Sequence, residues 1–461
     1  MNKTSHRRGA ESPEGRPIIR ARLRALCASA VRLLSACALA LFLSSCSDRS
    51  DGAKANQTTI TWLVPQQLDR PLVEALATQF RTENPDINLK PIFVPGAQYQ
   101  VKLKTLIAAG QPPDVFCCGD IFVAYLLPFM KDLSPLVEGD AAEVDLADVY
   151  PQILDVCKWH GQFRLIPRWF NVSLLYYNRK LFDEAHEPYP TSDWTWDEYL
   201  AAAQRLTKRS DDKTVQSWGT QIVTGWWGEW LTLVQQGGGR LFDDDLQTCL
   251  LDQPEAKAGM HFYVDKVWKY HVAPPPGRGP DQGFASNQLA MELVGHTGNW
   301  TQFNQISGLD WDIQLLPAGP VTRAGGEMTL EAIGMSKDTP HVEECWRFIK
   351  FMFRKSSIRA HADAGYLPIR KSVAAETFLS PSHAANPRHA NLAYEALKYA
   401  KSIPRSPDFF EIVQEVIQPE IDRALADGAD IDECCRRATR AANDFIKTLG
   451  NERRDHVTAS K

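Results

Sequence analysis

The chain has 461 residues, of which 51 are Lys or Arg and 56 are Asp or Glu, so its formal net charge is −5 at pH 7. The first 45 residues hold eight basic and two acidic side chains, so the remainder is strongly acidic, with 43 basic and 54 acidic residues. This balance argues against nucleic acid as a partner and against adhesion of the protein surface to anionic lipid, because both require a basic face. A chain of this length exceeds one typical domain and indicates two.

Residues 1–45 have the pattern of a secretory signal peptide. A basic leader is followed by the apolar run 33–42, which is shorter than the roughly 20 residues that span a bilayer, and then by Leu43-Ser44-Ser45-Cys46. A cysteine after leucine and two small residues resembles a bacterial lipobox. The resemblance implies removal of residues 1–45 and lipid on Cys46, with the polar tether 46–58 holding the protein at an extracytoplasmic membrane surface, periplasmic or at the cell surface. The alternative is an ordinary signal peptide in which Cys46 is incidental.

Strand and helix patterns alternate directly after the tether. Residues 60–64 read as a buried strand, 72–80 as a helix, 87–94 as a strand, 99–107 as a helix, and a further strand begins at 115. This order predicts a parallel α/β sheet, in which Pro91 favours an edge position for the second strand. Because ligands bind beyond the carboxyl ends of such strands, we expect the loops 65–67 and 118–120 to line a crevice.

The rest of the chain is mainly helical in pattern. Helices are predicted over 196–206, 254–270, 342–353, 392–400 and 410–426. Seven cysteines follow Cys46, an odd number, so at least one stays unpaired unless the chain dimerises. Their pairing cannot be read from the sequence. The adjacent cysteines lack the gaps of metal ligands, and we predict neither a metal nor another cofactor.

Eight short motifs occur in an order that resembles the family 1 extracellular solute-binding proteins, the receptor subunits of ABC importers. They begin with Phe80-x-x-x-Asn84-Pro85-Asp86-Ile87 and continue with Leu106-x-x-Ala109-Gly110-x-x-Pro113-Asp114-Val115. The others are Tyr177-Asn178-Arg179-x-Leu181-Phe182, Thr195-Trp196-Asp197-Glu198-Tyr199, Gly237-Gly238-Gly239, Phe284 to Met291, Gly298-Asn299-Trp300, and Gly365-Tyr366-Leu367-Pro368-Ile369-Arg370. Asp86 and Asn287 stand where the family commonly has glycine.

The resemblance implies a two-lobe periplasmic-binding-protein fold similar to maltose-binding proteins, each lobe a mainly parallel sheet flanked by helices, with a multi-strand hinge. We expect 59–170 and 326–366 in lobe 1, 171–325 and the helices of 367–450 in lobe 2, and a polar tail over 451–461. Crossings between lobes are expected near Asn171, Gly325-Gly326 and Leu367. The implied function is capture of a sugar between the lobes, for transfer to membrane permease subunits, by a monomer without catalytic residues.

The expected ligand site combines aromatic rings, which cover the C–H faces of a sugar, with polar groups for its hydroxyls. The resemblance places Trp300 first, then Trp226 or Trp227, with packing in the core as the alternative for each. The other candidates are Gln66, Gln67, Asp120, Trp169, Asn171, Tyr366 and Arg370. Asp120 is equally compatible with a helix N-cap, and Arg370 with a structural salt bridge. The four polar candidates Gln66, Gln67, Asp120 and Asn171 carry one formal charge, which favours a neutral polyhydroxylated ligand over phosphate or a polyamine.

Two other classes of function compete with this interpretation. A glycosidase needs two carboxylates about 5–10 Å apart in a cleft, and the acidic run Asp243-Asp244-Asp245 is typical of a solvated loop. The sequence has neither a Gly-x-Ser-x-Gly elbow nor a His-Glu-x-x-His zinc motif. A two-lobe receptor that signals to a membrane partner has the same sequence features as a transport receptor.

Overall fold

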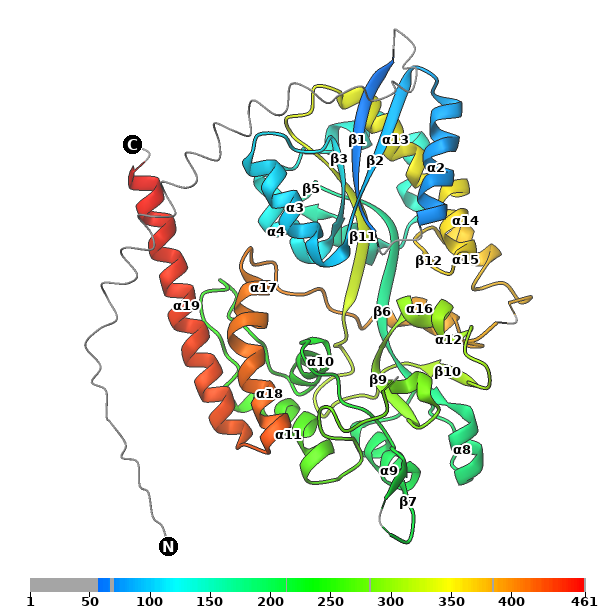
Figure 1. Ribbon diagram of the computed structural model, residues 1–461, viewed down its shortest axis with the longest axis vertical. Coiled ribbons are helices and arrows are strands. Elements are labelled where there is room, and N and C mark those ends of the chain that lie inside the picture. Colours follow the sequence, from blue (N-terminus) through cyan, green and yellow to red (C-terminus); the bar gives the residue numbers. More distant parts are fainter. Residues whose placement is uncertain (1–56, 67–69, 213, 282, 384, 460–461) are drawn as a thin grey trace, which may run out of the picture. The chain divides into compact units, whose positions relative to one another are not determined.

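The computed structural model describes residues 57–459 apart from 67–69, 213, 282 and 384. The expected signal peptide, the lipidated Cys46, most of the tether and Gln67 lie outside the described residues. The α/β fold is confirmed. One mixed sheet runs through the molecule in the order β10-β6-β11-β3-β1-β2, with β9 and β12 also paired to β6 (Figure 1).

The amino-terminal part of the sheet is parallel, as the alternating pattern predicts. Strand β1 (Thr58–Pro65) pairs in parallel with β2 (Ile87–Val94) and with β3 (Val115–Gly119). Strand β2 is the last in the order, so Pro91 lies on an edge strand, where a missing N–H donor is tolerated. The carboxyl ends of β1 and β3 therefore lie side by side, followed by Gln66 and Asp120.

A single long strand, β6 (Ile166–Asn178), joins the two parts of the sheet (Figure 1). Its first half pairs with β11 (Met328–Met335) and β12 (Leu367–Pro368), and its second half with β9 (Met291–His296) and β10 (Trp311–Gln314). All four pairings are antiparallel, which corrects the expectation of two mainly parallel sheets. The physical reason is that both parts of the sheet share β6. The strands β9 to β12 come back to it in the opposite direction and therefore pair with it antiparallel.

Two hydrophobic clusters organise the helices. The first contains β1–β3 and packs against α2 (Arg70–Glu83), α3 (Gly96–Ala108), α4 (Val123–Leu126), α5 (Ser134–Gly139), α6 (Ala141–Val144), α7 (Pro151–Val156), α12 (Trp300–Phe303), α13 (Val342–Phe353), α14 (Lys355–Asp363), α15 (Lys371–Glu376) and α16 (Asn391–Ala396). The second packs α8 (Arg179–Ala185), α9 (Trp196–Leu206), α10 (Gly228–Gln236), α11 (Pro254–Trp268), α17 (Phe409–Glu411), α18 (Gln418–Asp427) and α19 (Ile431–Ala459). Short pieces complete the chain: β4 (Lys158–Trp159), β5 (Gln162–Phe163), β7 (Lys208–Arg209), β8 (Val215–Ser217) and the turn of 3₁₀-helix η1 (Asp120–Phe122).

The predicted helix boundaries agree closely where caps are strong. Helix α9 spans the predicted 196–206 because Thr195 and Glu198 form a capping box. The predicted helix 410–426 is instead divided into α17, the π-helical η6 (Ile412–Ile417) and α18. The predicted helix 392–400 ends early, at Ala396.

Packing along β6 connects the two clusters. Leu174 and Tyr176 belong to the first cluster, and Leu175 and Tyr177 to the second, because successive side chains of a strand point to opposite faces. The first cluster continues to Leu397, past the expected lobe boundary at residue 367, and the second resumes at Ile403. The exact division into lobes stays a prediction.

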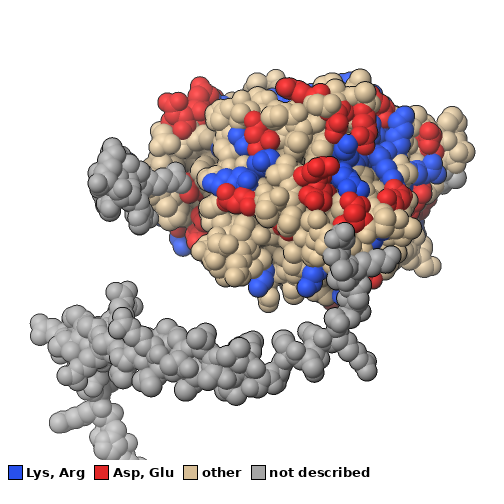
Figure 2. Space-filling view, turned by 90° about the horizontal axis from the view of Figure 1, so that it is seen from above, with Lys and Arg blue, Asp and Glu red and all other residues tan. Residues whose placement is uncertain are grey.

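All seven cysteines in the described residues are buried free thiols. None of the helices in the described part of the chain combines the length and apolar character needed to cross a bilayer. On the face seen in Figure 2, basic and acidic side chains are interspersed. Ion pairs connect α13 to its neighbours, such as Arg347 with Asp86 and Lys350 with Glu143.

Candidate functional site

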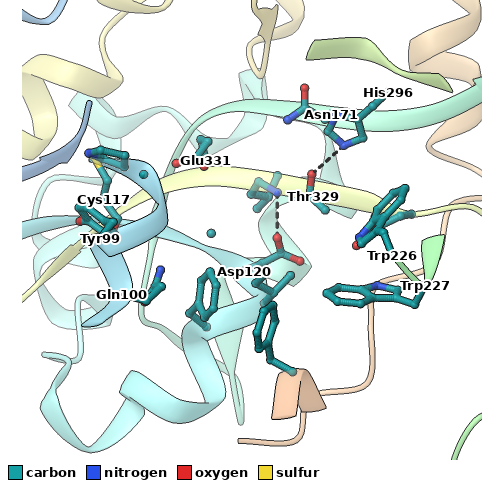
Figure 3. A pocket seen from close by; sticks show the side chains of 18 of the residues that line it. Tyr99, Gln100, Cys117, Asp120, Asn171, Trp226, Trp227, His296, Thr329 and Glu331 are labelled. Carbon is teal, nitrogen blue, oxygen red and sulfur yellow. Dashed lines mark hydrogen bonds between the residues drawn. The ribbon is translucent and has the colours of Figure 1, made fainter. Parts of the chain in front are cut away.

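A cavity of about 450 Å³ opens beyond the carboxyl ends of β1 and β3, as expected for an α/β sheet (Figure 3). Pro65, Gly119 and Asp120 contribute from these strand ends. Asn171 of β6 and His296 of β9 contribute from the other part of the sheet. The cavity is thus lined by segments that are far apart in sequence, and its volume falls in the range of roughly 300–1,000 Å³ typical of small-molecule sites.

Two tryptophans form an aromatic wall on one side of the cavity (Figure 3). Trp226 is half-buried, and Trp227 is almost fully buried against the rings of Phe409 and Phe410, with ring centroids 5.3 and 6.0 Å away. Trp226 therefore offers the more accessible ring, and Trp227 supports it. Phe410 itself is 39% exposed and also lines the cavity.

The loop that carries both tryptophans is held by a buried ion pair behind it. Glu229 and Lys266 are 1% and 0% exposed, and the ammonium of Lys266 donates to one carboxylate oxygen of Glu229. The other oxygen accepts the backbone N–H of Val223 at 2.8 Å, and Gln414 donates to the carbonyl of Gly225 at 2.9 Å. These bonds fix the backbone on the amino-terminal side of Trp226.

Asp120, at the start of η1, also lines the cavity (Figure 3). One of its oxygens accepts the backbone N–H of Leu330 at 2.9 Å, across the pairing of β3 with β11. Burial raises the pKa of Asp120 to about 7, although the hydrogen bond from Leu330 opposes the shift. Asp120 is the first residue of η1, and the N-cap position belongs to Gly119.

Two glutamates of the β11 segment, which the sequence argument did not single out, also line the cavity. Burial, together with the charge of Asp120, raises the pKa of Glu327 to about 8. Burial also raises the pKa of Glu331, against the opposing charge of Arg168, whose guanidinium lies 3.8 Å from the Glu331 carboxylate. The cavity therefore holds three carboxyl groups rather than the one counted from the sequence.

Neutral polar groups complete the lining near Asn171. The Asn171 side-chain oxygen accepts a hydrogen bond from the hydroxyl of Thr297 at 3.3 Å. The hydroxyl of Thr329 lies 3.3 Å from His296 Nε2 (Figure 3). Burial lowers the pKa of His296 to about 4, so its imidazole is neutral at pH 7. These groups can donate and accept hydrogen bonds, as a polyhydroxylated molecule requires.

The structure brings together Asp120, Asn171, Trp226 and Trp227 from the predicted set, and the other predicted residues that it describes do not line this cavity. Gln66 is exposed and does not line the cavity. Trp169 is 3% exposed and stacks on Tyr366 with ring centroids 4.3 Å apart. Arg370 is 2% exposed and binds the carbonyls of Val144 and Phe353 and the carboxylate of Asp148, which is the anchoring role left open above.

Trp300 also lies away from this cavity. It is 2% exposed, its indole N–H donates to the hydroxyl of Tyr176 at 2.6 Å, and its ring packs 5.7 Å from that of Phe378. It borders a second cavity of about 390 Å³, between α12, α14 and the segment after α15. The Gly-x-Trp pattern thus marks a core residue that packs against Tyr176 of β6.

Replacing Trp300 by phenylalanine should therefore affect stability rather than binding. Loss of the hydrogen bond to Tyr176 is expected to lower the free energy of unfolding by about 1 kcal/mol. The thermal shift produced by a ligand should keep its size. Urea denaturation and a ligand titration on the same variant measure both quantities, and an unchanged stability with a lost ligand shift would place the ligand at Trp300.

The sequence does contain a signal for the missed glutamates. Glu327, Thr329 and Glu331 alternate with Met328 and Leu330, the period of a strand with one polar face. That face follows the glycine pair at which a crossing is expected. The signal for Phe410 is weaker, because an aromatic residue at the start of a helix is usually part of the core.

Comparison with known proteins gives a consistent result. Residues 65–357 match the family model of the bacterial extracellular solute-binding proteins. The erythritol/L-threitol-binding protein of Mycolicibacterium smegmatis is 24% identical over 363 residues, 71% of this chain and 74% of that protein. The mannitol-binding protein of Pseudomonas aeruginosa is 28% identical over 247 residues, 52% of this chain and 54% of that protein.

Solved structures show the same fold. An ABC substrate-binding protein from Listeria monocytogenes, in complex with cycloalternan, superposes with a TM-score of 0.73 at 25% identity, over 86% of this chain and 99% of that chain. The family model spans well over half of the present chain, including β3, β6, β9 and β11, which contribute residues to the cavity. With its mixed sheet and its cavity beyond the strand ends, this chain belongs to the bacterial extracellular solute-binding protein family.

Proposed function

We propose that the protein captures a sugar or a sugar alcohol in the cavity beside Asp120 and delivers it to the permease of an ABC importer. The observation that carries the proposal is the placing of aromatic rings opposite hydrogen-bonding groups in one cavity (Figure 3). The rings of Trp226 and Phe410 suit the C–H faces of a carbohydrate. Asp120 and Asn171, on other elements, suit its hydroxyls.

The relatives support a polyhydroxylated ligand. Their names include binding proteins for erythritol and L-threitol and for mannitol, and the Listeria protein was solved in complex with cycloalternan. Members of the family are receptors that bind a solute without transforming it. The predicted lipid on Cys46 would keep the receptor at the outer side of a membrane, next to its permease, and stays part of this proposal.

The hinge gives capture a mechanical basis. A ligand that touches residues from both parts of the sheet stabilises the arrangement in which those parts lie close together. Asp120 follows β3 on one side, while Asn171 and Gly326 stand at the expected crossings. Gly326 has φ +81°, in the left-handed region that favours glycine. The lobe division given above remains part of the proposal.

A thermal-shift screen tests the function. The full chain without its signal peptide is heated with mono- and oligosaccharides and with sugar alcohols of four to six carbons. A ligand that binds only the native state raises the melting temperature by mass action, and we expect at least one compound to raise it by several degrees at millimolar concentration. If no member of the panel shifts the melting temperature and calorimetry detects no binding heat, the carbohydrate proposal is wrong.

A further inference from the structure

In the described part of the chain, the cavity is lined by acidic side chains without basic ones. Asp120, Glu327 and Glu331 line it, and no lysine or arginine does so among the described residues. Arg168 lies behind the wall, 1% exposed and 3.8 Å from Glu331, so it offsets that one carboxylate. No ion pair of the described residues involves Asp120 or Glu327. A neutral sugar needs hydrogen-bond acceptors, but it does not need two uncompensated carboxyl groups.

Glu327 carries the second observation. Its side chain is about nine-tenths buried, at 6% exposure, and its Oε2 atom has no hydrogen-bond partner among the described residues. The indole N–H of Trp227 is close enough to oppose the upward shift of the Glu327 pKa, but the contact does not have the geometry of a hydrogen bond, so both groups can still pair with a ligand. A buried carboxyl oxygen without a donor is costly, and this one lines the ligand cavity. Glu327 Oε2 can therefore accept a hydrogen bond from a donor group of the ligand.

The surrounding rings suit a cation as well as a sugar. Trp226, Trp227 and Phe410 lie on the wall next to Glu327. The faces of aromatic rings attract ammonium groups, and most strongly so at desolvated sites. An ammonium group would thus find a carboxylate acceptor and aromatic faces at the same place, whereas a quaternary ammonium would leave Oε2 without a donor.

We propose that the natural ligand is an amine-bearing carbohydrate, an amino sugar or aminated sugar alcohol, whose primary ammonium donates to Glu327 and lies within the field of Asp120. This inference rests on the proposed function, since the hydroxylated part of the ligand uses the same cavity. No bond is made or broken. The only accompanying event is loss of a carboxyl proton to solvent when the ammonium enters.

Proton release follows from the state of the empty site. Burial holds the pKa of Asp120 at about 7 and that of Glu327 at about 8, so at pH 7 these groups are substantially protonated. An ammonium pairs with the ionised form, so its affinity should rise with pH, by up to about tenfold per unit below the carboxyl pKa. The other charged groups near these two are Glu331 with Arg168, neutral His296, Arg405 beyond Asp120, and exposed Lys401, whose backbone bridges to that of Glu327.

The experiment uses matched pairs of ligands. D-glucose is compared with D-glucosamine, and D-sorbitol with 1-amino-1-deoxy-D-sorbitol, together with the amino counterparts of any hit from the carbohydrate screen. Isothermal titration calorimetry at pH 7 in phosphate and in Tris reports both affinity and proton release. We expect the amine of the best pair to bind about tenfold tighter or more, and its binding heat to differ between the two buffers.

Variants show which carboxyl groups cause the preference for the amine ligand. Glu327→Gln should reduce the preference for the amine to within about twofold, and Asp120→Asn, which keeps the acceptor for Leu330, should reduce it in part. Asp244→Asn, at a side chain that is 90% exposed, is the control for general charge effects. Circular dichroism checks that each variant is folded. If Glu327→Gln does not fold, the amine proposal is still tested by the amine preference of Asp120→Asn and by the pH dependence of amine affinity in the wild-type protein.

The outcomes separate the two proposals. Equal or tighter binding of the neutral member of every pair overturns the amine proposal and leaves carbohydrate binding intact. An amine preference that survives in both Glu327→Gln and Asp120→Asn also overturns it, because the ammonium would then bind elsewhere. Failure of both members of every pair to bind overturns the carbohydrate function itself.

Discussion

Replacing Trp226 by alanine is expected to weaken binding of the best ligand from the screen by about thirtyfold or more, while the protein stays folded. Trp226 is the half-buried ring of the aromatic wall, whereas Trp227 is 3% exposed and packs on Phe409. Truncation of an aromatic residue at the centre of a binding site commonly costs about 2 kcal/mol or more, which corresponds to that loss of affinity. Calorimetric titration measures it directly.

Trp226→Phe is the matched control for this variant. It keeps an aromatic face in the same place, so it should lose several-fold less affinity than Trp226→Ala. Both variants should retain the wild-type melting temperature within about 2 °C without ligand, because the side chain is only half-buried. Wild-type affinity in Trp226→Ala would show that the ligand does not rest on this ring.

Replacing Lys266 by methionine should produce the largest loss of stability. The substitution leaves the Glu229 carboxylate buried at 1% exposure without its cation. Removal of one partner from a buried ion pair commonly costs about 3–5 kcal/mol, because the remaining charge is not compensated. Glu229 also accepts the backbone N–H of Val223, so the loop that carries Trp226 should loosen. Urea denaturation measures the first effect, and ligand affinity measures the second.

The double variant Glu229→Gln with Lys266→Met separates charge from shape. Glutamine keeps an acceptor for the N–H of Val223 and carries no charge. We expect the double variant to recover most of the lost stability and affinity, because a neutral replacement of a buried pair is often tolerated. If it is as unstable as Lys266→Met alone, the loss comes from packing around the lysine stem rather than from the unpaired charge.

The fold could be predicted from the sequence where local signals were strong. The alternation of strands and helices after residue 58 identified β1, α2, β2, α3 and β3, because each strand is a short apolar run and each helix has one apolar face. Asp120 was expected in the crevice because it follows a strand, and Trp226 because the resemblance places an aromatic residue before the glycine turn at 237–239; both line the cavity. The directions of β9 and β10 could not be predicted, because they depend on their pairing with the single strand β6, which has partners along both of its halves.

The sequence alone could not predict which side chains lie in the core and which line the cavity. Trp300 and Trp226 are the same residue type in similarly patterned segments, but one donates to Tyr176 in the core and the other borders the cavity. The decisive difference is which partner the tertiary structure brings near, and no local pattern contains that information. The charge of the site was missed for the same reason. Glu327 and Glu331 are more than 200 residues from Asp120 in sequence and meet it only through the pairing of β3 with β11.

The continuity of β6 has a consequence for how the protein can be divided. Its 13 residues serve as neighbours to β11 and β12 at one end and to β9 and β10 at the other, and both hydrophobic clusters include its side chains. A cut within this strand would leave each fragment with open backbone donors and acceptors and with half of a core. Neither part is therefore a module that could be exchanged between relatives as a cassette. To change the ligand specificity of this protein, one should leave β6 intact and alter the loops beside it.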